Sequence, residues 1–474
     1  LAGDPEAGPL AEEADVLNSL GNWAEAGRRY DIAAEAQGSS PVEAGLIQCR
    51  RAYCRMRVGK FVEASKILQS LESNASALVR VTAEVVAVEQ AAREGRLEEC
   101  VELGNRAETS VKDLGPAAPP ILVADLHNAI GSALGLLRRG EEAEPHFRTA
   151  MAAAKLGGLP VRTATIAANC AVYLVEQGRL DEAIELLEGR EPDLRRHGDT
   201  VMLATLLNNL AALHILGGDM DGGRGWLEEA LRIYSLLGDS ANAAAVRYNL
   251  GIHESIRDRA PGAARQFEEA LRLLSGCEGK LPEPAATVAC LVRIGLAEAR
   301  NMQGKRSLAA PLLDEVAKCE ECRSKAVVQA RLMIARSRAA QQSRKYDGSV
   351  ELARRAVALA SGRGEEGALA ACRLSLALAA AGRDAESAHE AREAEKLSAG
   401  FPVHAAGFRK AYARAFDENR KRRDATAVKS RGSAGGNGGG VAHQTGHRQR
   451  SPDPRRAAGR EPRRAREQRR AGRR

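Results

Sequence analysis

Aromatic residues are scarce in this sequence, at 3% of its 474 residues. Apolar residues make up 44% of the chain, and Ala, Leu and Val supply most of them. Because β-sandwiches and barrels depend on aromatic and β-branched side chains, this composition argues against them and favours helices with small contact residues. The chain is also longer than one hydrophobic core, which grows to roughly 250–300 residues.

Long apolar runs are missing as well. The stretch Leu203–Leu216 is too short for a membrane span of ~20 apolar residues, and Asn208, Asn209 and His214 interrupt it. No basic start followed by an apolar run marks a secretory signal. Nine scattered cysteines, an odd number, do not suggest a disulfide framework. We therefore predict a cytoplasmic protein without membrane contact.

Sequence motifs of catalysis are absent: G-x-x-x-x-G-K-[ST], H-E-x-x-H and G-x-S-x-G do not occur. Cys319–Cys322 spells C-x-x-C, but it lacks the further ligands of a zinc site, so packing of two small residues on a helix is favoured. Gly362–Gly367 spells G-x-G-x-x-G, but it follows a predicted helix and contains two Glu, which favours an interhelical loop. We predict no catalytic activity, no metal site and no cofactor.

Charge is divided unevenly along the chain. Residues 418–474 contain 18 Lys and Arg against 5 Asp and Glu, a net charge of +13, whereas the preceding residues contain 52 against 57, a net charge of −5. Such a basic tail could add a weak, salt-dependent contact with polyanions. It has no aromatic residue for base stacking, and the bland alternative is a solvated extension.

An internal repeat of 40 residues is the strongest feature of the sequence. Asn169, Asn209 and Asn249 occur at equal intervals of 40. Each is followed by a Gly or polar break and then by a segment that starts with acidic residues, as the positive end of a helix favours. Each unit therefore reads as two amphipathic helices, and such a hairpin must stack on neighbours to bury its apolar face.

Small residues recur where the two helices of a unit would cross, and a bulky residue follows to fill the groove. The small residues are Ala171, Ala211 and Gly251, and the bulky ones are Phe147, Leu187, Leu227 and Phe267.

The repeat resembles the tetratricopeptide repeat in the forty-residue spacing of kinesin light chains and several bacterial regulators. The residues that carry the resemblance include Asn128–Gly131 with Glu142–Ala150, Gly21–Ala26 and Gly59–Ala64. The resemblance implies an all-α fold, a right-handed α-solenoid of about ten helical hairpins followed by a disordered basic tail.

The units are predicted to start near residues 7, 45, 81, 124, 164, 204, 244, 290, 330 and 368, after an extension of residues 1–6. The repeat array spans 7–403. Pro- and Gly-rich insertions at Gly115–Pro120 and Gly276–Pro284 divide it into possible sub-arrays 7–114, 124–275 and 290–403. A capping helix is predicted at 404–420, and a disordered tail at 421–474.

The repeated asparagines are candidate binding residues. By resemblance, the first helix of each unit lines a concave groove, where a ladder of Asn side chains could hold a peptide backbone. The alternative is hydrogen bonding between adjacent helices without a ligand. The predicted groove residues are Asn128, Asn169, Thr205, Asn208, Asn209, Tyr248 and Asn249.

Three functions remain open from the sequence. The first is a non-catalytic scaffold that binds a peptide or protein segment in the groove. The second is the C-terminal sensor or regulatory arm of a larger bacterial signalling protein, with a kinase or nucleotide-switch domain upstream; Leu1 in place of an initiator Met favours a missing upstream portion. The third is nucleic-acid binding through the basic tail.

Overall fold

The computed structural model describes residues 7–19, 22–36, 40–276, 285–323, 325–360 and 364–434. These residues form α-helices and one short 3₁₀ helix, with no β-strand among them. The chain divides into two compact units, Leu1–Arg420 and Lys421–Arg474. The all-α class predicted from composition and period is confirmed.

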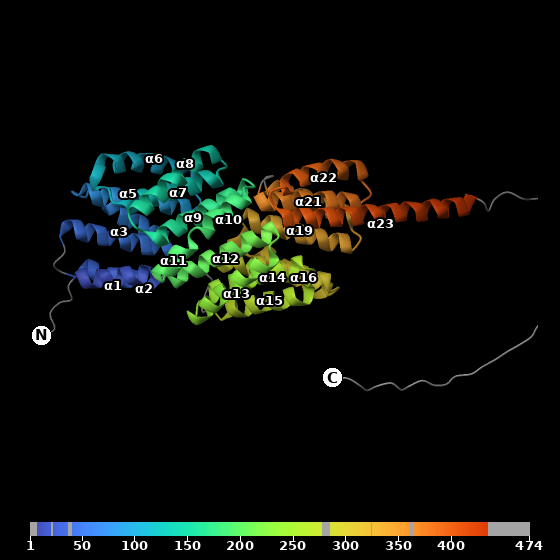
Figure 1. Cartoon of the computed structure of the whole chain (residues 1–474), viewed down its shortest axis with the longest axis horizontal. Coiled ribbons are helices and arrows are strands. Elements are labelled where there is room, and N and C mark those ends of the chain that lie inside the picture. The colour runs from blue at the N-terminus through green and yellow to red at the C-terminus, as the bar shows by residue number, and fades with distance from the viewer. Residues whose placement is uncertain are drawn as a thin grey trace, which may run out of the picture. The chain divides into compact units, whose positions relative to one another are not determined.

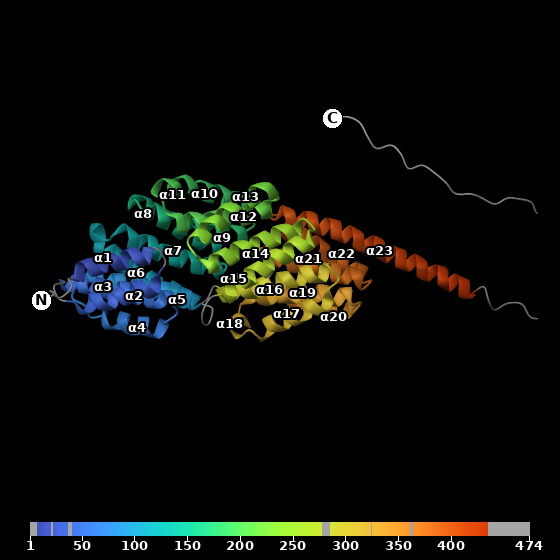
Figure 2. The ribbon, with the colours of Figure 1, turned by 90° about the horizontal axis from the view of Figure 1, so that it is seen from below.

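Consecutive helices pair into ten hairpins in the described part of the chain (Figures 1 and 2). The first helices of the hairpins are α1 (Ala7–Ser19), α3 (Pro41–Arg57), α5 (Ala77–Arg93), α7 (Pro120–Leu136), α9 (Pro160–Glu176), α12 (Thr200–Gly217), α14 (Ser240–Ile256), α16 (Ala285–Met302), α19 (Ala326–Gln342) and α21 (Gly364–Ala380). The second helices are α2 (Trp23–Glu35), α4 (Phe61–Ser70), α6 (Leu97–Leu114), α8 (Gly140–Leu156), α10 (Leu180–Glu188), α13 (Met220–Leu236), α15 (Ala260–Ser275), α17 (Arg306–Lys318), α20 (Tyr346–Ala360) and α22 (Asp384–Ser398). The predicted α-solenoid of about ten hairpins is confirmed.

Four further elements connect or extend the hairpins. They are η1 (Gly115–Ala117), α11 (Glu191–His197), α18 (Glu320–Arg323) and α23 (Pro402–Ala434). Helix α11 was not foreseen in the fifth unit, where Gly189 ends α10 and Pro192 lies in the first turn of the new helix. The insertion at Gly115–Pro120 contains η1, whereas residues 277–284 of the other insertion lie outside the described residues.

Most first helices begin about four residues before the predicted unit starts, because caps and prolines decide where a helix begins. Helices α7 and α9 have Pro at their first position, which suits the fixed φ of proline. Asp199 and Asp239 cap α12 and α14, accepting hydrogen bonds from backbone N–H groups at 2.8 and 3.0 Å. The apolar pattern of the sequence begins only about one turn after these helix starts, so it places the start of each unit too late.

In the fourth and seventh hairpins a small residue lies against a bulky one at the helix crossing, as predicted. Phe147, Leu187, Leu227 and Phe267 are all buried. The rings of Phe147 and Phe267 lie directly against Gly131 and Gly251 of their partner helices. Phe267 also touches the next unit, since a Cβ on Gly295 would lie 2.6 Å from its Cζ atom. One ring therefore fixes both the hairpin and the stacking of its neighbour.

The buried side chains between Val81 and Leu250 form one continuous cluster from α5 to α14. Helix α12 is the one described helix that is long and apolar enough, by length and composition, to cross a membrane. Its side chains Ala204, Leu206 and Leu207 are fully buried within this cluster. Helix α12 is therefore the core helix of a repeat in this structure.

The first helices of the last six hairpins form a closed series of contacts, in which the last helix touches the first. Helix α9 contacts α12, and the contacts continue through α14, α16 and α19 to α21, which in turn contacts α9. Figure 2 shows the labels of these helices gathered in the same part of the molecule. We call α9, α12, α14, α16, α19 and α21 the closed ring.

The ring closes where glycines allow two turns to meet. Gly400, before α23, lies against Gly178, after α9, and a Cβ on Gly400 would come within 2.8 Å of the Gly178 carbonyl oxygen. Arg138 donates to the Ala360 carbonyl oxygen at 3.5 Å, and Lys410 lies 3.4 Å from a carboxylate oxygen of Asp258. Residues more than 150 positions apart thus share one contact zone.

The C-terminal end of the array differs from its predicted bounds. The capping helix predicted at 404–420 begins at Pro402 and continues to Ala434, so residues 421–434, predicted as disordered, are helical. This segment is rich in Lys, Arg and Ala, which favour helices without apolar burial. Phe408 of α23 is buried against Ala371 and Ala391 of the last hairpin. Residues 1–6 and 435–474, the predicted extension and the rest of the tail, lie outside the described residues.

Because the ring closes through a contact between two glycines, adding one methyl group at Gly400 should lower the stability of the fold. Gly400→Ala should lower the free energy of unfolding by roughly 1–3 kcal/mol, because the new Cβ overlaps the backbone of Gly178. Gly348→Ala is the matched control, since a Cβ at this position of α20 meets nothing within 4 Å and should stabilise the helix. Chemical denaturation measures both. Equal stability of the two variants would contradict the close approach of Gly178 and Gly400.

The same zone predicts a pH dependence. Burial and the neighbouring Glu366 and Glu365 raise the pKa of Glu176 to about 6, against the opposing effect of Arg138. A pKa raised on folding contributes stability that is complete below the unfolded value of about 4.5 and is lost as pH rises through about 6. Glu176→Gln should therefore flatten the stability curve between these values and gain about 1 kcal/mol above pH 7, a value reduced for partial exposure.

The control for this prediction is Glu185→Gln, which removes one negative charge from an exposed position of α10. Stability of each variant is followed by denaturant unfolding from pH 4 to pH 8. A wild-type slope that persists unchanged in Glu176→Gln would show that Glu176 does not carry it.

Candidate functional site on the first helices of the repeats

The repeated asparagines pair between adjacent first helices. Asn169 of α9 donates from its Nδ2 to the Oδ1 of Asn128 on α7 at 3.0 Å. Asn249 of α14 donates in the same way to Asn208 of α12 at 2.9 Å. All four side chains are half-buried. The two pairs each span 41 residues and join neighbouring repeats, whereas Asn209, which shares the interval of 40 with Asn169 and Asn249, belongs to neither pair.

Asn209 differs from these four. It is half-buried on α12, and its side chain makes no hydrogen bond to any described residue. An amide side chain offers two N–H donors and a carbonyl oxygen with two lone pairs. Each Asn pair uses only one donor and one acceptor, so most of the hydrogen-bonding capacity of these five residues is unused by the described chain.

The other two predicted groove residues are engaged with the fold itself. The Oγ1 of Thr205 lies 3.0 Å from the Val201 carbonyl oxygen and 2.7 Å from the hydroxyl of Tyr234 on the second helix α13. The ring centroid of Tyr248 lies 6.0 Å from that of Phe267, and burial raises the pKa of its phenol to about 12. The structure thus places both on first helices but against their own hairpins.

A charged cluster inside the closed ring was missed by the sequence reasoning. Arg331 of α19 lies 2.8 Å from a carboxylate oxygen of Glu365 and 3.1 Å from one of Glu366, both in the first turn of α21. His404 of α23 contacts Glu365 at 3.0 Å. Burial opposes ionisation of Glu365, but Arg331 and His404 outweigh it and hold its pKa well below the usual range.

This cluster changes the interpretation of the G-x-G-x-x-G pattern. Residues 361–363 lie outside the described residues, and Gly364 begins α21 instead of lying within a loop. The two Glu bind Arg331, which is 34 and 35 residues away in the sequence. The first helix of the preceding unit carries three Arg, Arg331, Arg336 and Arg338, so the sequence did not single out Arg331 as the partner.

The C-x-x-C pattern is divided between two elements. Cys319 is the C-cap of α17, and Cys322 belongs to the short α18, so the two cysteines do not lie on one helix as expected. The cause is a break after Lys318, where the extended backbone of Cys319 ends the helix.

A second ion pair joins α7 and α9, the first helices of the fourth and fifth hairpins. The Nε of Arg162 lies 2.9 Å from a carboxylate oxygen of Asp125. Burial raises the pKa of Asp125 to about 7, against the opposing effect of Arg162. Asp125 lies about one turn from Asn128 on α7, and Arg162 lies about two turns from Asn169 on α9, so the polar surface extends along both helices.

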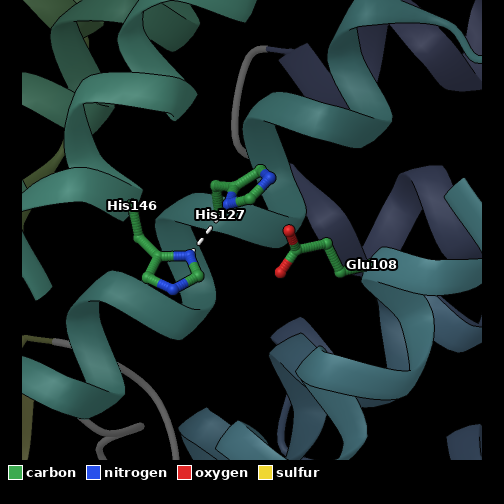
Figure 3. Close-up of side chains that lie close together, drawn as sticks. All are labelled: Glu108, His127 and His146. Atoms are coloured by element: carbon green, nitrogen blue, oxygen red, sulfur yellow. Dashed lines mark hydrogen bonds between the residues drawn. The ribbon is translucent and has the colours of Figure 1, made fainter. Parts of the chain in front are cut away.

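Three helices bring Glu108, His127 and His146 together, and the sequence reasoning missed this group too. Figure 3 shows both imidazole rings, from α7 and α8, facing the carboxylate of Glu108 on α6. The Nδ1 atoms of the two rings lie 2.8 Å apart, and one ligand atom from each of the three residues lies within 4.8 Å of the others. Only the spacing of 19 residues between the histidines, across one hairpin, could have suggested it.

Comparisons with known proteins agree with this architecture. Residues 122–188 and 202–275 match the tetratricopeptide repeat family model. The apo form of RapI is similar in structure, with a TM-score of 0.54 and 11% identity over 74% of this chain and 97% of that chain. A Rap protein complexed with Competence and Sporulation Factor gives a TM-score of 0.50 and 13% identity over 74% and 98%.

BtubC (BKLC) from P. vanneervenii is 22% identical over 47% of this chain and 90% of that chain, with a TM-score of 0.41. No curated protein sequence matches the chain.

The difference between paired and unpaired asparagines predicts different effects on stability. Asn169→Ala should lower the free energy of unfolding by about 0.5–1.5 kcal/mol, since it leaves Asn128 without its partner. Asn209→Ala removes no hydrogen bond and should be neutral or slightly stabilising, because Ala favours helices. Urea unfolding of both variants measures this. A loss for Asn209→Ala as large as that for Asn169→Ala would contradict the geometry.

Proposed function

We propose that this chain, a tetratricopeptide-type repeat protein, is a non-catalytic scaffold that binds a peptide or protein segment along its first helices. The observation that carries the proposal is the row of half-buried Asn side chains with unused donors and acceptors on α7, α9, α12 and α14. A peptide backbone presents one N–H and one C=O per residue, which such amides can bind without selecting a side chain.

The geometry favours a segment that lies across the helices. Asn128, Asn169, Asn208, Asn209 and Asn249 come from four successive repeats, so their amides follow the stacking direction of the hairpins. An extended chain advances ~3.3 Å per residue and packed helices lie roughly 8–10 Å apart, so about every third residue can lie over a successive repeat. The Asp125–Arg162 pair adds a further polar contact beside this row.

The fold itself is compatible with ligand binding. The Rap protein of similar structure was solved in complex with Competence and Sporulation Factor. That finding concerns the Rap protein, and its bearing on this chain is limited to the shared fold. The case for this chain rests on its own Asn side chains.

The test is selection of peptides from a random display library on the full chain, followed by fluorescence anisotropy of the selected peptides. Asn209→Ala should weaken the affinity about two- to tenfold, because one hydrogen bond contributes ~0.5–1.5 kcal/mol. The triple variant Asn169→Ala, Asn209→Ala, Asn249→Ala should weaken it roughly ten- to a thousandfold if the effects add.

Asn105→Ala is the matched control, because Asn105 is exposed on the second helix α6 and has no side-chain partner among the described residues. Its affinity should equal that of the wild type. Unchanged affinity in a folded triple variant would end the assignment of these asparagines to binding.

A further inference from the structure

We propose that Glu108, His127 and His146 form a binding site for a divalent transition-metal ion of the zinc type. The three side chains come from three different helices, and Figure 3 shows that they converge. Two imidazole nitrogens and a carboxylate oxygen are ligands that Zn²⁺, Co²⁺ and Ni²⁺ accept, whereas Mg²⁺ and Ca²⁺ prefer oxygen alone. Water molecules would complete the coordination. The site does not depend on the proposed function.

To bind an ion, the two Nδ1 atoms would move slightly apart and the Glu108 carboxylate would move closer to them. Two ligands of a tetrahedral zinc ion lie about 3.3 Å apart, since each is about 2.0–2.1 Å from the metal. The two Nδ1 atoms are 2.8 Å apart, and one ligand atom from each of the three residues lies within 4.8 Å of the others. Glu108 is half-buried at the open side of the group, so rotation of its side chain can bring an oxygen closer.

The protonation states also suit a metal. The close contact between the two Nδ1 atoms requires that one of them accepts and therefore carries a free lone pair in place of a proton. In the metal-free pair one Nδ1–H donates to the other Nδ1. When both Nδ1 atoms bind the ion, the donor ring loses that proton and takes one at Nε2, so the pair needs no net change of protonation.

One competing contact must be displaced or shared. The ammonium of Lys112 lies 2.7 Å from an oxygen of Glu108, but this pair is one helical turn of α6 and the Lys112 side chain is mostly exposed. Such exposed pairs are weak. The second carboxylate oxygen of Glu108 remains for the ion.

The position of the site gives it a structural consequence. Glu108 belongs to the third hairpin, and His127 and His146 belong to the fourth, on the two sides of the Gly115–Pro120 insertion. A bound ion would therefore join two repeats across the Gly115–Pro120 insertion. It would tie α6 to both helices of the next hairpin.

The experiment is titration of the untagged full chain with ZnCl₂ by isothermal calorimetry, together with melting curves at each zinc concentration. We expect one equivalent to bind with a micromolar or lower Kd and to raise the melting temperature. His146→Gln should weaken binding at least about a hundredfold, and Glu108→Gln about tenfold. MgCl₂ should not bind at this site.

His214→Gln is the matched control. His214 also has two carboxylate neighbours, Glu188 at 3.1 Å and Asp219 at 3.2 Å, but they contact opposite ring nitrogens and cannot share one ion with it. This variant should bind zinc like the wild type.

Circular dichroism establishes that His146→Gln and Glu108→Gln remain folded, which is expected because both positions are half-buried. Absence of zinc binding by the wild type, or full affinity in both folded variants, would overturn the proposal. Neither result would affect peptide binding by the asparagines, since these are measured on separate variants.

Discussion

The structure depends on the contact between a small residue of one helix and a bulky residue of its partner. Gly251 against Phe267 is the clearest example, because the aromatic ring occupies the place that any Cβ would take. The same ring reaches Gly295 in the next hairpin, so one side chain sets both the angle within a repeat and the step to the following one. In the last two hairpins the helices meet instead through buried serines, Ser337 with Ser349 and Ser375 with Ser387, so a small residue is kept at the crossing there too.

The rotation from each hairpin to the next adds up along the chain and brings distant repeats together. Helices α9 and α21 belong to the fifth and tenth hairpins and yet contact each other, with Gly178 and Gly400 at the meeting point. The charged groups Glu176, Arg331, Glu365 and His404 lie along this closure. The first-helix faces of the last six repeats therefore line a ring. The ring limits which of their side chains a partner could reach.

The period of 40 residues was enough to predict the hairpins, the crossing contacts and the buried rings of Phe147 and Phe267, because each depends on local spacing. Helix starts at Pro120 and Pro160 were misplaced by four residues, since the apolar pattern does not record caps. The pairing of Asn169 with Asn128 was foreseen only as an alternative to a groove. The contacts of Glu365 with Arg331, and of His127 with His146, could not be read from the sequence, because they depend on how neighbouring repeats stack.

The central claim is that the repeats close on themselves between α9 and α21. The most direct measurement is a distance between spin labels attached through unnatural amino acids at Gln177 and Ala399, both exposed next to the glycines that meet. Pulsed electron resonance on the full chain should give a short and narrow distance distribution. A long or broad distribution, in a protein whose circular dichroism remains fully helical, would contradict the closed ring and leave only an open stack of hairpins.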